Sequence, residues 1–92
     1  MRLALVGLGQ VAEKAHLPAF AKRGHEVVAV CENTPERLEA ARRLLPNARI
    51  YSSLDLLLAN EKQLDFVDIA TPPFLHSDQT LACLKAGRHV LC

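Results

Sequence analysis

Short apolar segments alternate with helical patterns along the whole 92-residue chain, and this alternation constrains the fold more than any other feature. Continuous apolar runs of strand length are typical of parallel strands that are covered on both faces. The five candidate strands are Arg2–Val6, Glu26–Cys31, Ala48–Tyr51, Phe66–Ala70 and His89–Cys92. We therefore predict one domain over residues 1–92, an α/β fold with a doubly wound parallel sheet in the order β-α-β-α-β-α-β-α-β.

Two of the intervening helices are predicted from their punctuation. Thr34-Pro35-Glu36 supplies a capping hydroxyl, a proline at the first helical position and an acid near the positive end of the helix dipole. Pro46-Asn47 ends this helix. Ser52 and Ser53 can cap a shorter helix that turns three leucines toward the sheet, namely Leu54, Leu57 and Leu58.

The first helix is predicted to be interrupted. It begins at Gln10, but Pro18 lacks the N–H that would bond to the carbonyl of Lys14. The helix should therefore end or kink near His16, and a second segment should run from Pro18 to Lys22. The first turn, whose free N–H groups attract anions, lies before the proline and is unaffected.

The last helix is predicted over Leu75–Ala86. Pro72-Pro73 precedes it, and Gly87 is placed to end it. From their helical spacing, we expect Leu81 and Leu84 on its buried side.

The turn after the first strand has the spacing of a phosphate-binding motif. Gly7-Leu8-Gly9-Gln10-Val11-Ala12 fits G-x-G-x-x-[G/A]. One glycine makes the tight turn, one lets a pyrophosphate approach bare backbone, and a small residue lets the helix pack on the strand. Any tight strand-to-helix turn can use two glycines, so the motif gains its weight from the strand before it and the helix after it.

Glu32 stands directly after the end of the second strand and is the candidate ligand for an adenosine ribose. It stands 23 positions after Gly9, near the spacing of about 20 expected for such an acid. Its carboxylate accepts from two neighbouring hydroxyls and repels a 2′-phosphate, which favours NAD over NADP. An exposed loop acid is the alternative, and Asn33 is a possible substitute ligand.

A third candidate segment follows the fourth strand. Thr71-Pro72-Pro73 forms a rigid, extended turn that can lie along a cofactor or serve only as a connector. For His76, a capping or packing role competes with a ligand contact. Lys14 and His16 lie near the glycine turn, with a solvated lysine and a structural histidine as the alternatives. Asp68, inside the strand, is expected to bond locally to backbone.

Composition excludes several classes of function. Eleven basic and ten acidic residues, scattered without a run of like charge, give a net charge of +1 and argue against nucleic-acid or membrane partners. No Ser/His/Asp, Cys/His or paired-carboxylate arrangement is defensible, so the chain offers no catalytic residues of its own. The three cysteines lack metal-ligand or redox spacing, so we expect no metal, buried thiols and, with no signal peptide, a cytoplasmic protein.

Three stretches together resemble one known family: ALVGLGQVAEKAHLPAF, VVAVCENTPERLEAA and FVDIATPPFLHSDQTLACLKAGRHVLC. They resemble the amino-terminal domain of the Gfo/Idh/MocA oxidoreductases, a group that includes glucose-fructose oxidoreductase and inositol dehydrogenase. The third stretch is the most specific, through A-T-P-x-x-x-H followed by A-G-x-H-V. The resemblance implies a Rossmann domain that holds NAD or NADP for hydride transfer to or from a sugar, cyclitol or related polyol.

The resemblance also implies roles for individual residues. Those expected to contact the cofactor are Gly7, Gly9, Gln10 and Val11 at the pyrophosphate, Glu32 at the adenosine ribose, and Thr71, Pro72, Pro73 and His76 along its length. In this family a substrate-binding E-K-P motif follows H-V-L-C, and the catalytic aspartate and histidine lie in a second domain. We therefore expect this chain to be a piece of a larger, homo-oligomeric enzyme.

Two other functions stay open. A short Rossmann unit can bind or sense NAD(H) as a stand-alone module without catalysis, which a free carboxyl terminus at Cys92 would favour. An adenosylmethionine-binding methyltransferase also uses a glycine turn and an acid after the second strand, but the Ala12 spacing and the Thr-Pro-Pro stretch argue against it.

Overall fold

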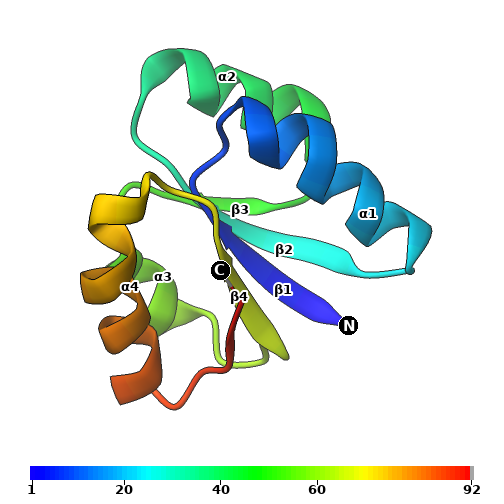
Figure 1. The fold of residues 1–92 in the computed structure, drawn as a ribbon. Coiled ribbons are helices and arrows are strands. Elements are labelled where there is room, and N and C mark those ends of the chain that lie inside the picture. The colour runs from blue at the N-terminus through cyan, green and yellow to red at the C-terminus, as the bar shows by residue number, and fades with distance from the viewer. Residues whose placement is uncertain (92) are drawn as a thin grey trace.

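The computed structural model describes residues 1–91 and arranges them as a five-stranded sheet with helices on both faces (Figure 1). The strands are β1 (Arg2–Val6), β2 (Glu26–Cys31), β3 (Arg49–Tyr51), β4 (Phe66–Ile69) and β5 (Val90–Leu91). Neighbouring strands are parallel, in the order β3-β2-β1-β4-β5. The predicted doubly wound parallel sheet is confirmed. The predicted strands included Ala48, Ala70 and His89, which lie just outside the observed ones, and Cys92 lies outside the described residues.

The strand order reverses between β1 and β4. From β1 the chain winds outward through β2 to β3, and then crosses to β4 and β5 on the other side of β1. The carboxyl ends of β1 and β4 lie side by side, with Val6 opposite Ile69. Ligands bind doubly wound sheets at this reversal, so the segments that leave β1 and β4 form the walls of the expected crevice.

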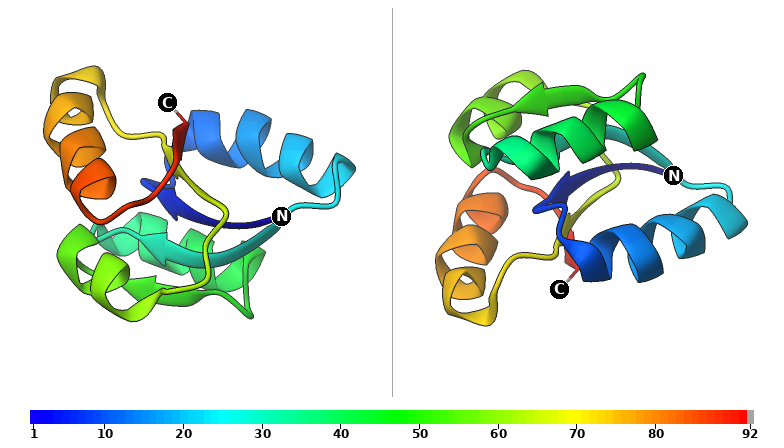
Figure 2. Two further views of the ribbon diagram at one scale, coloured as in Figure 1. Left: turned by 90° about the horizontal axis from the view of Figure 1, so that it is seen from below. Right: turned by 90° about the horizontal axis from the view of Figure 1, so that it is seen from above.

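Helices cover the two faces in separate groups (Figure 2). The helices of one face are η1 (Ala12–His16), α1 (Leu17–Lys22) and α2 (Pro35–Leu44), and those of the other are α3 (Leu54–Asn60) and α4 (Pro73–Lys85). Successive side chains of β1 point to opposite faces of the sheet and so contribute to both hydrophobic clusters. Leu5 packs toward Ala41 of α2, whereas Ala4 and Val6 pack toward Leu57 and Cys83.

The first helix does not end at His16, one of the two outcomes that the sequence predicted, but it changes there from a π-helical turn to an α-helix. Gln10 and Val11 are already helical, η1 is a π-helical turn, and α1 continues it directly. Leu17 donates its N–H to the carbonyl of Ala12, five residues earlier. This wider turn accommodates Pro18, which has no N–H to donate. The run ends at Lys22, as predicted.

The prediction for the buried side of α4 is wrong. Leu81 and Leu84 are 51% and 58% exposed, whereas Cys83 is fully buried. The helix packs through Cys83, and Leu81, two residues earlier, lies about 200° around the helix from it. The helix also begins at Pro73, before the predicted Leu75–Ala86, and Gly87 follows it with a φ of 76°.

The other two helices are confirmed, with one difference in capping. In α3, Ser53 Oγ accepts the N–H of Leu56 at 3.1 Å, and Leu57 and Leu58 are buried. Thr34 stands at the N-cap of α2, but within residues 1–91 its hydroxyl makes no capping bond. The hydroxyl instead lies close enough to the carboxylate of Glu32 to help lower the pKa of that group.

Candidate functional site

Gly7 makes the tight turn that leaves β1. Its φ of 91° lies in the left-handed region, which favours glycine. A Cβ built at this position would lie 2.8 Å from Thr71 Cγ2 and 3.3 Å from the carbonyl carbon of Ala70. The turn can therefore pack against the segment that leaves β4 only because residue 7 has no side chain.

Gly9 leaves bare backbone facing open space. A Cβ at Gly9 would meet only Arg37 Cζ, at 3.9 Å. Gln10 and Val11, both exposed, begin the helix directly after it. The N–H groups of a first helical turn lack intrahelical acceptors and attract anions. Ala12 is 1% exposed and packs in the core, as predicted for the small third position.

Glu32 is buried at the end of β2 and faces the glycine turn. Its Oε2 accepts the N–H of Leu8 at 2.9 Å, and its Oε1 accepts those of Asn33 and Thr34 at 3.0 and 3.2 Å. Burial raises the pKa of Glu32, but these amide hydrogen bonds outweigh it and bring the pKa below its ordinary value. The carboxylate is ionised at neutral pH and ties the two turns together, which excludes the alternative of an exposed loop acid.

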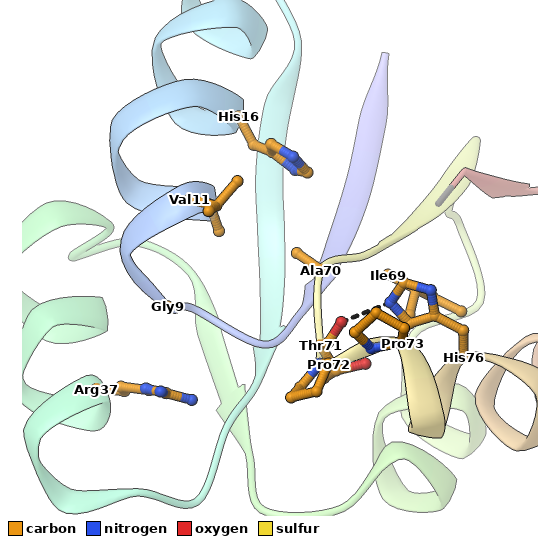
Figure 3. A pocket seen from close by; sticks show the side chains of 11 residues that line it. Gly9, Val11, His16, Arg37, Ile69, Ala70, Thr71, Pro72, Pro73 and His76 are labelled. Atoms are coloured by element: carbon orange, nitrogen blue, oxygen red, sulfur yellow. Dashed lines mark hydrogen bonds between the residues drawn. The ribbon is translucent and has the colours of Figure 1, made fainter.

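Side chains of α4 hold the turn that leaves β4. Thr71 Oγ1 donates to Gln79 Oε1. His76 Nε2 donates to the carbonyl oxygen of Thr71 at 2.5 Å, because a carbonyl can only accept (Figure 3). Pro72 is extended and Pro73 begins α4. His76 therefore has a structural role in holding this turn, but it makes no capping bond to the free N–H groups of α4, and it also lines the adjoining hollow.

Two hollows flank the glycine turn. One, of about 300 Å³, is lined by Glu32 and Asn33 at the end of β2. The other, of about 400 Å³, lies between His16 and His76 (Figure 3). The two hollows share Arg37, Thr71 and Pro72, so together they form one crevice across the reversal of strand order.

Nine of the ten predicted site residues line this crevice. They are Gly7, Gly9, Val11, Glu32, Asn33, Thr71, Pro72, Pro73 and His76. Gln10 is exposed at the start of the helix and lines neither hollow. Lys14 is exposed and also lines neither of them, which fits a solvated lysine.

Arg37 is a crevice residue that the sequence analysis missed. It lies in the first turn of α2, and its side chain points into the crevice near Gly9 (Figure 3). The helix contains two further arginines, Arg42 and Arg43. Only its position close to the N-terminus of α2, beside the end of β2, distinguishes Arg37 from them.

His16 reaches the crevice from η1 and is anchored by Asp68. Its Nδ1 lies 2.6 Å from Oδ2 of Asp68, which is fully buried in β4. The expectation that Asp68 bonds locally to backbone is wrong, because its partner is 52 positions away. Asp68 is paired with Leu5 in the sheet, and it points to the face that η1 covers.

Residues 1–91 give little support for metal binding, a membrane span or a reactive thiol at Cys31. Among residues 1–91, no group of three or more His, Cys, Asp or Glu side chains is placed to hold a metal ion. No helix of that range has the length and apolar character needed to cross a membrane. Burial and the neighbouring carboxylate of Glu32 raise the pKa of Cys31 to about 11, so it is an unreactive thiol at neutral pH.

The fold and the crevice define a Rossmann domain of the dinucleotide-binding type. The family described as "Oxidoreductase family, NAD-binding Rossmann fold" matches residues 1–92. The chain belongs to this family, the Gfo/Idh/MocA oxidoreductases, and the resemblance noted from the sequence is confirmed.

Known proteins of similar sequence and structure agree with this placement. D-glucoside 3-dehydrogenase of Escherichia coli strain K12 is 34% identical over 93 residues, covering all of this chain and 26% of that protein. The WlbA dehydrogenase from Bordetella pertussis, solved with NADH and UDP-GlcNAcA, superposes with a TM-score of 0.87 at 40% identity, covering 97% of this chain and 27% of that one. Myo-inositol 2-dehydrogenase from Lactobacillus plantarum superposes with a TM-score of 0.87 at 28% identity, covering 100% and 27%. The chain thus spans about a quarter of these relatives.

Proposed function

We propose that this domain binds NAD(H) along the crevice and holds it for hydride transfer in a dehydrogenase. One observation carries the proposal: the buried carboxylate of Glu32 is hydrogen-bonded to the glycine turn. An acid suited to ribose hydroxyls and bare backbone suited to a pyrophosphate thereby lie in one crevice, at the reversal of strand order. The bound nicotinamide ring would supply the hydride chemistry, and the residues of this chain would bind and orient it.

The residues present fit such a cofactor from end to end. Gly9, Gln10 and Val11 offer backbone N–H groups to the pyrophosphate, and Arg37 adds positive charge opposite them. Glu32 and Asn33 would hold the adenosine ribose in the smaller hollow. The nicotinamide riboside would then enter the larger hollow, whose wall includes Pro73 and His76 together with the shared Thr71 and Pro72.

We propose NAD as the preferred cofactor over NADP. The ionised Glu32 carboxylate accepts hydrogen bonds from ribose hydroxyls and repels the dianionic 2′-phosphate. Arg37 also lines this hollow, but its Cζ lies 3.9 Å from the Cβ position of Gly9, so we assign its charge to the pyrophosphate and not to the 2′ position.

The names of the relatives support a substrate class. They include a glucoside dehydrogenase and an inositol dehydrogenase, so we propose a sugar, cyclitol or related polyol as the hydride donor or acceptor. We further propose that residues 1–92 are one domain of a larger, cytoplasmic homo-oligomer in which another domain provides the catalytic residues. The short coverage of the relatives supports this division.

Fluorescence titration of the full-length protein with NADH and NADPH tests the proposal. We expect saturable binding of both, with NADH bound at least about tenfold more tightly because of Glu32. Preference for NADPH would contradict the role of Glu32, and failure to bind either dinucleotide would contradict the proposed function.

A further inference from the structure

The larger hollow contains a histidine whose position is set by a buried acid. The side chain of His16 is 30% exposed, and that of Asp68 beneath it is 1% exposed. Oδ2 of Asp68 is 2.6 Å from His16 Nδ1, while Oδ1 has no hydrogen-bond partner within residues 1–91. A buried carboxylate is costly without partners, so the bond to His16 is its principal compensation among the described residues.

This bond determines which nitrogen of the ring carries a proton. A carboxylate accepts hydrogen bonds, so we assign the donated proton to Nδ1 of His16. In the neutral imidazole, Nε2 is then an acceptor. The flipped orientation of the His16 ring is disfavoured, because it would place a carbon atom where Nδ1 now bonds to Asp68.

The local backbone is also unusual where His16 sits. His16 is the last residue of η1, the π-helical turn between Gln10-Val11 and α1. Such turns are rare and are frequently found at functional sites. Figure 3 shows His16 reaching from this turn toward Ala70, across the hollow from His76. A histidine that only packed in the core would be buried, whereas the ring of His16 is partly exposed and lines the larger hollow.

The arrangement of the crevice indicates which part of a dinucleotide His16 would meet. Glu32 lies in the smaller hollow, and the glycine turn stands between the two hollows. A dinucleotide with its adenosine ribose at Glu32 and its pyrophosphate at Gly9 places its other riboside in the larger hollow. That riboside carries hydroxyl and carboxamide N–H donors.

We propose that His16 binds the nicotinamide riboside of NAD(H) through Nε2, and that Asp68 is the positioning residue that orients it. The proposal rests on the proposed function, because it assumes that the adenosine end lies at Glu32. The ligand group is a hydrogen-bond donor of the nicotinamide riboside, either a ribose hydroxyl or the carboxamide N–H.

The affinities of the full-length protein for three ligands distinguish contacts in the larger hollow from contacts in the smaller one. NADH carries the whole riboside, ADP-ribose keeps only its ribose, and ADP lacks it. His16→Asn retains a donor near the position of Nδ1 and loses Nε2, whereas Asp68→Asn retains the shape of the anchor and loses its charge. We expect His16→Asn to weaken NADH binding about tenfold and ADP binding less than twofold. Asp68→Asn should weaken NADH binding about threefold.

The ADP-ribose titration identifies the donor. A loss in His16→Asn equal to that for NADH assigns the contact to a ribose hydroxyl, and no loss assigns it to the carboxamide; either supports the proposal. His25→Asn is the matched control, since His25 packs against Phe20 and Phe66 outside the crevice. It should leave the binding of all three ligands unchanged.

Nitrogen-15 NMR of the His16 ring adds a readout that a packing histidine would not change. We expect the Nδ1-protonated tautomer in the free protein and a shift of Nε2 on adding NADH but not ADP. Equal losses of NADH and ADP binding in His16→Asn, or unchanged binding of both, would overturn the inference and leave the proposed function intact. Absence of NADH and ADP binding by the unmodified protein would overturn both.

Discussion

Glu32 and Glu61 are both buried glutamates, but they lie at opposite ends of the strands and have different partners. We call the side of the sheet where the strands end its carboxyl edge, and the side where they begin its amino edge. Glu32 lies at the carboxyl edge, and its partners are backbone N–H groups of two neighbouring turns. Glu61 follows α3 at the amino edge, and its partners are the side chains of Arg49 and Tyr51. The first arrangement joins two turns of the crevice, and the second joins α3 to β3.

The two carboxylates reach a lowered pKa by different routes. The hydrogen bonds from Arg49 lower the pKa of Glu61 most, ahead of the opposing effect of burial. The same bonds raise the pKa of Arg49, and donation to Glu61 raises that of Tyr51. The carboxylate of Glu61 bonds to the side chains of Arg49 and Tyr51, whereas the carboxylate of Glu32 lines the smaller hollow, where a ligand can meet its charge. Changes at the amino edge should therefore affect stability alone, and changes at the carboxyl edge should affect NAD(H) binding as well.

The largest effect is expected from Gly7→Ala. A methyl group there combines a left-handed φ with a 2.8 Å contact to Thr71, and we expect a loss of about 2–4 kcal/mol in the free energy of unfolding. Gly24→Ala is the control, because Gly24 has a φ of 73° with nothing within 4 Å of its Cβ position. It should cost only about 1–2 kcal/mol. Equal losses in urea unfolding would contradict the packing role of Gly7.

Glu61→Ala should lower stability without affecting the cofactor. Removing the acceptor of Arg49 and Tyr51 should cost about 1–3 kcal/mol of unfolding free energy. NADH affinity, measured by fluorescence at a temperature where the variant is folded, should stay within about twofold. A tenfold weaker affinity would show that the two edges are coupled.

Glu32→Gln should mainly affect the cofactor. We expect NADH binding to weaken about tenfold, roughly 1.4 kcal/mol, and the preference over NADPH to narrow because the 2′-phosphate is no longer repelled. Glu36→Gln, which changes an exposed acid on α2, is the control and should leave both affinities unchanged. An unaltered preference in Glu32→Gln would remove this carboxylate from the adenosine site.

The smallest effect concerns acid stability. Glu32 and Glu61 both have a folded pKa below the ordinary 4.5, so the stability they contribute is present above pH 4.5 and is lost as pH falls through the folded pKa. Urea unfolding at pH 7 and pH 3.5 should show a loss in the unmodified protein that is smaller in the double variant Glu32→Gln/Glu61→Gln. An equal loss in both proteins would mean that other groups dominate.

The sequence predicts the crevice well where the physics is local. The spacing of Gly7, Gly9 and Glu32 and the proline pair after β4 depend on backbone geometry, and the positions of the strands along the chain follow from apolar runs. Nine of the expected contact residues therefore line the crevice.

The sequence does not predict contacts that only the folded sheet creates. Asp68 meets His16 because β4 lies beside β1, and Glu61 meets Arg49 because α3 returns along β3. Leu81 and Leu84 have a helical spacing, but that spacing does not state which side of α4 faces the sheet. Pro18 predicts a disturbance of the helix, yet a π-helical turn absorbs it without a break.

A crystal structure of the full-length protein with bound NADH tests the central claim most directly. We predict Glu32 oxygens at about 2.5–3.0 Å from the adenosine ribose hydroxyls, the pyrophosphate over Gly9, and the nicotinamide riboside between His16 and His76. NADH bound with its adenosine ribose away from Glu32, or outside the crevice, would contradict the claim.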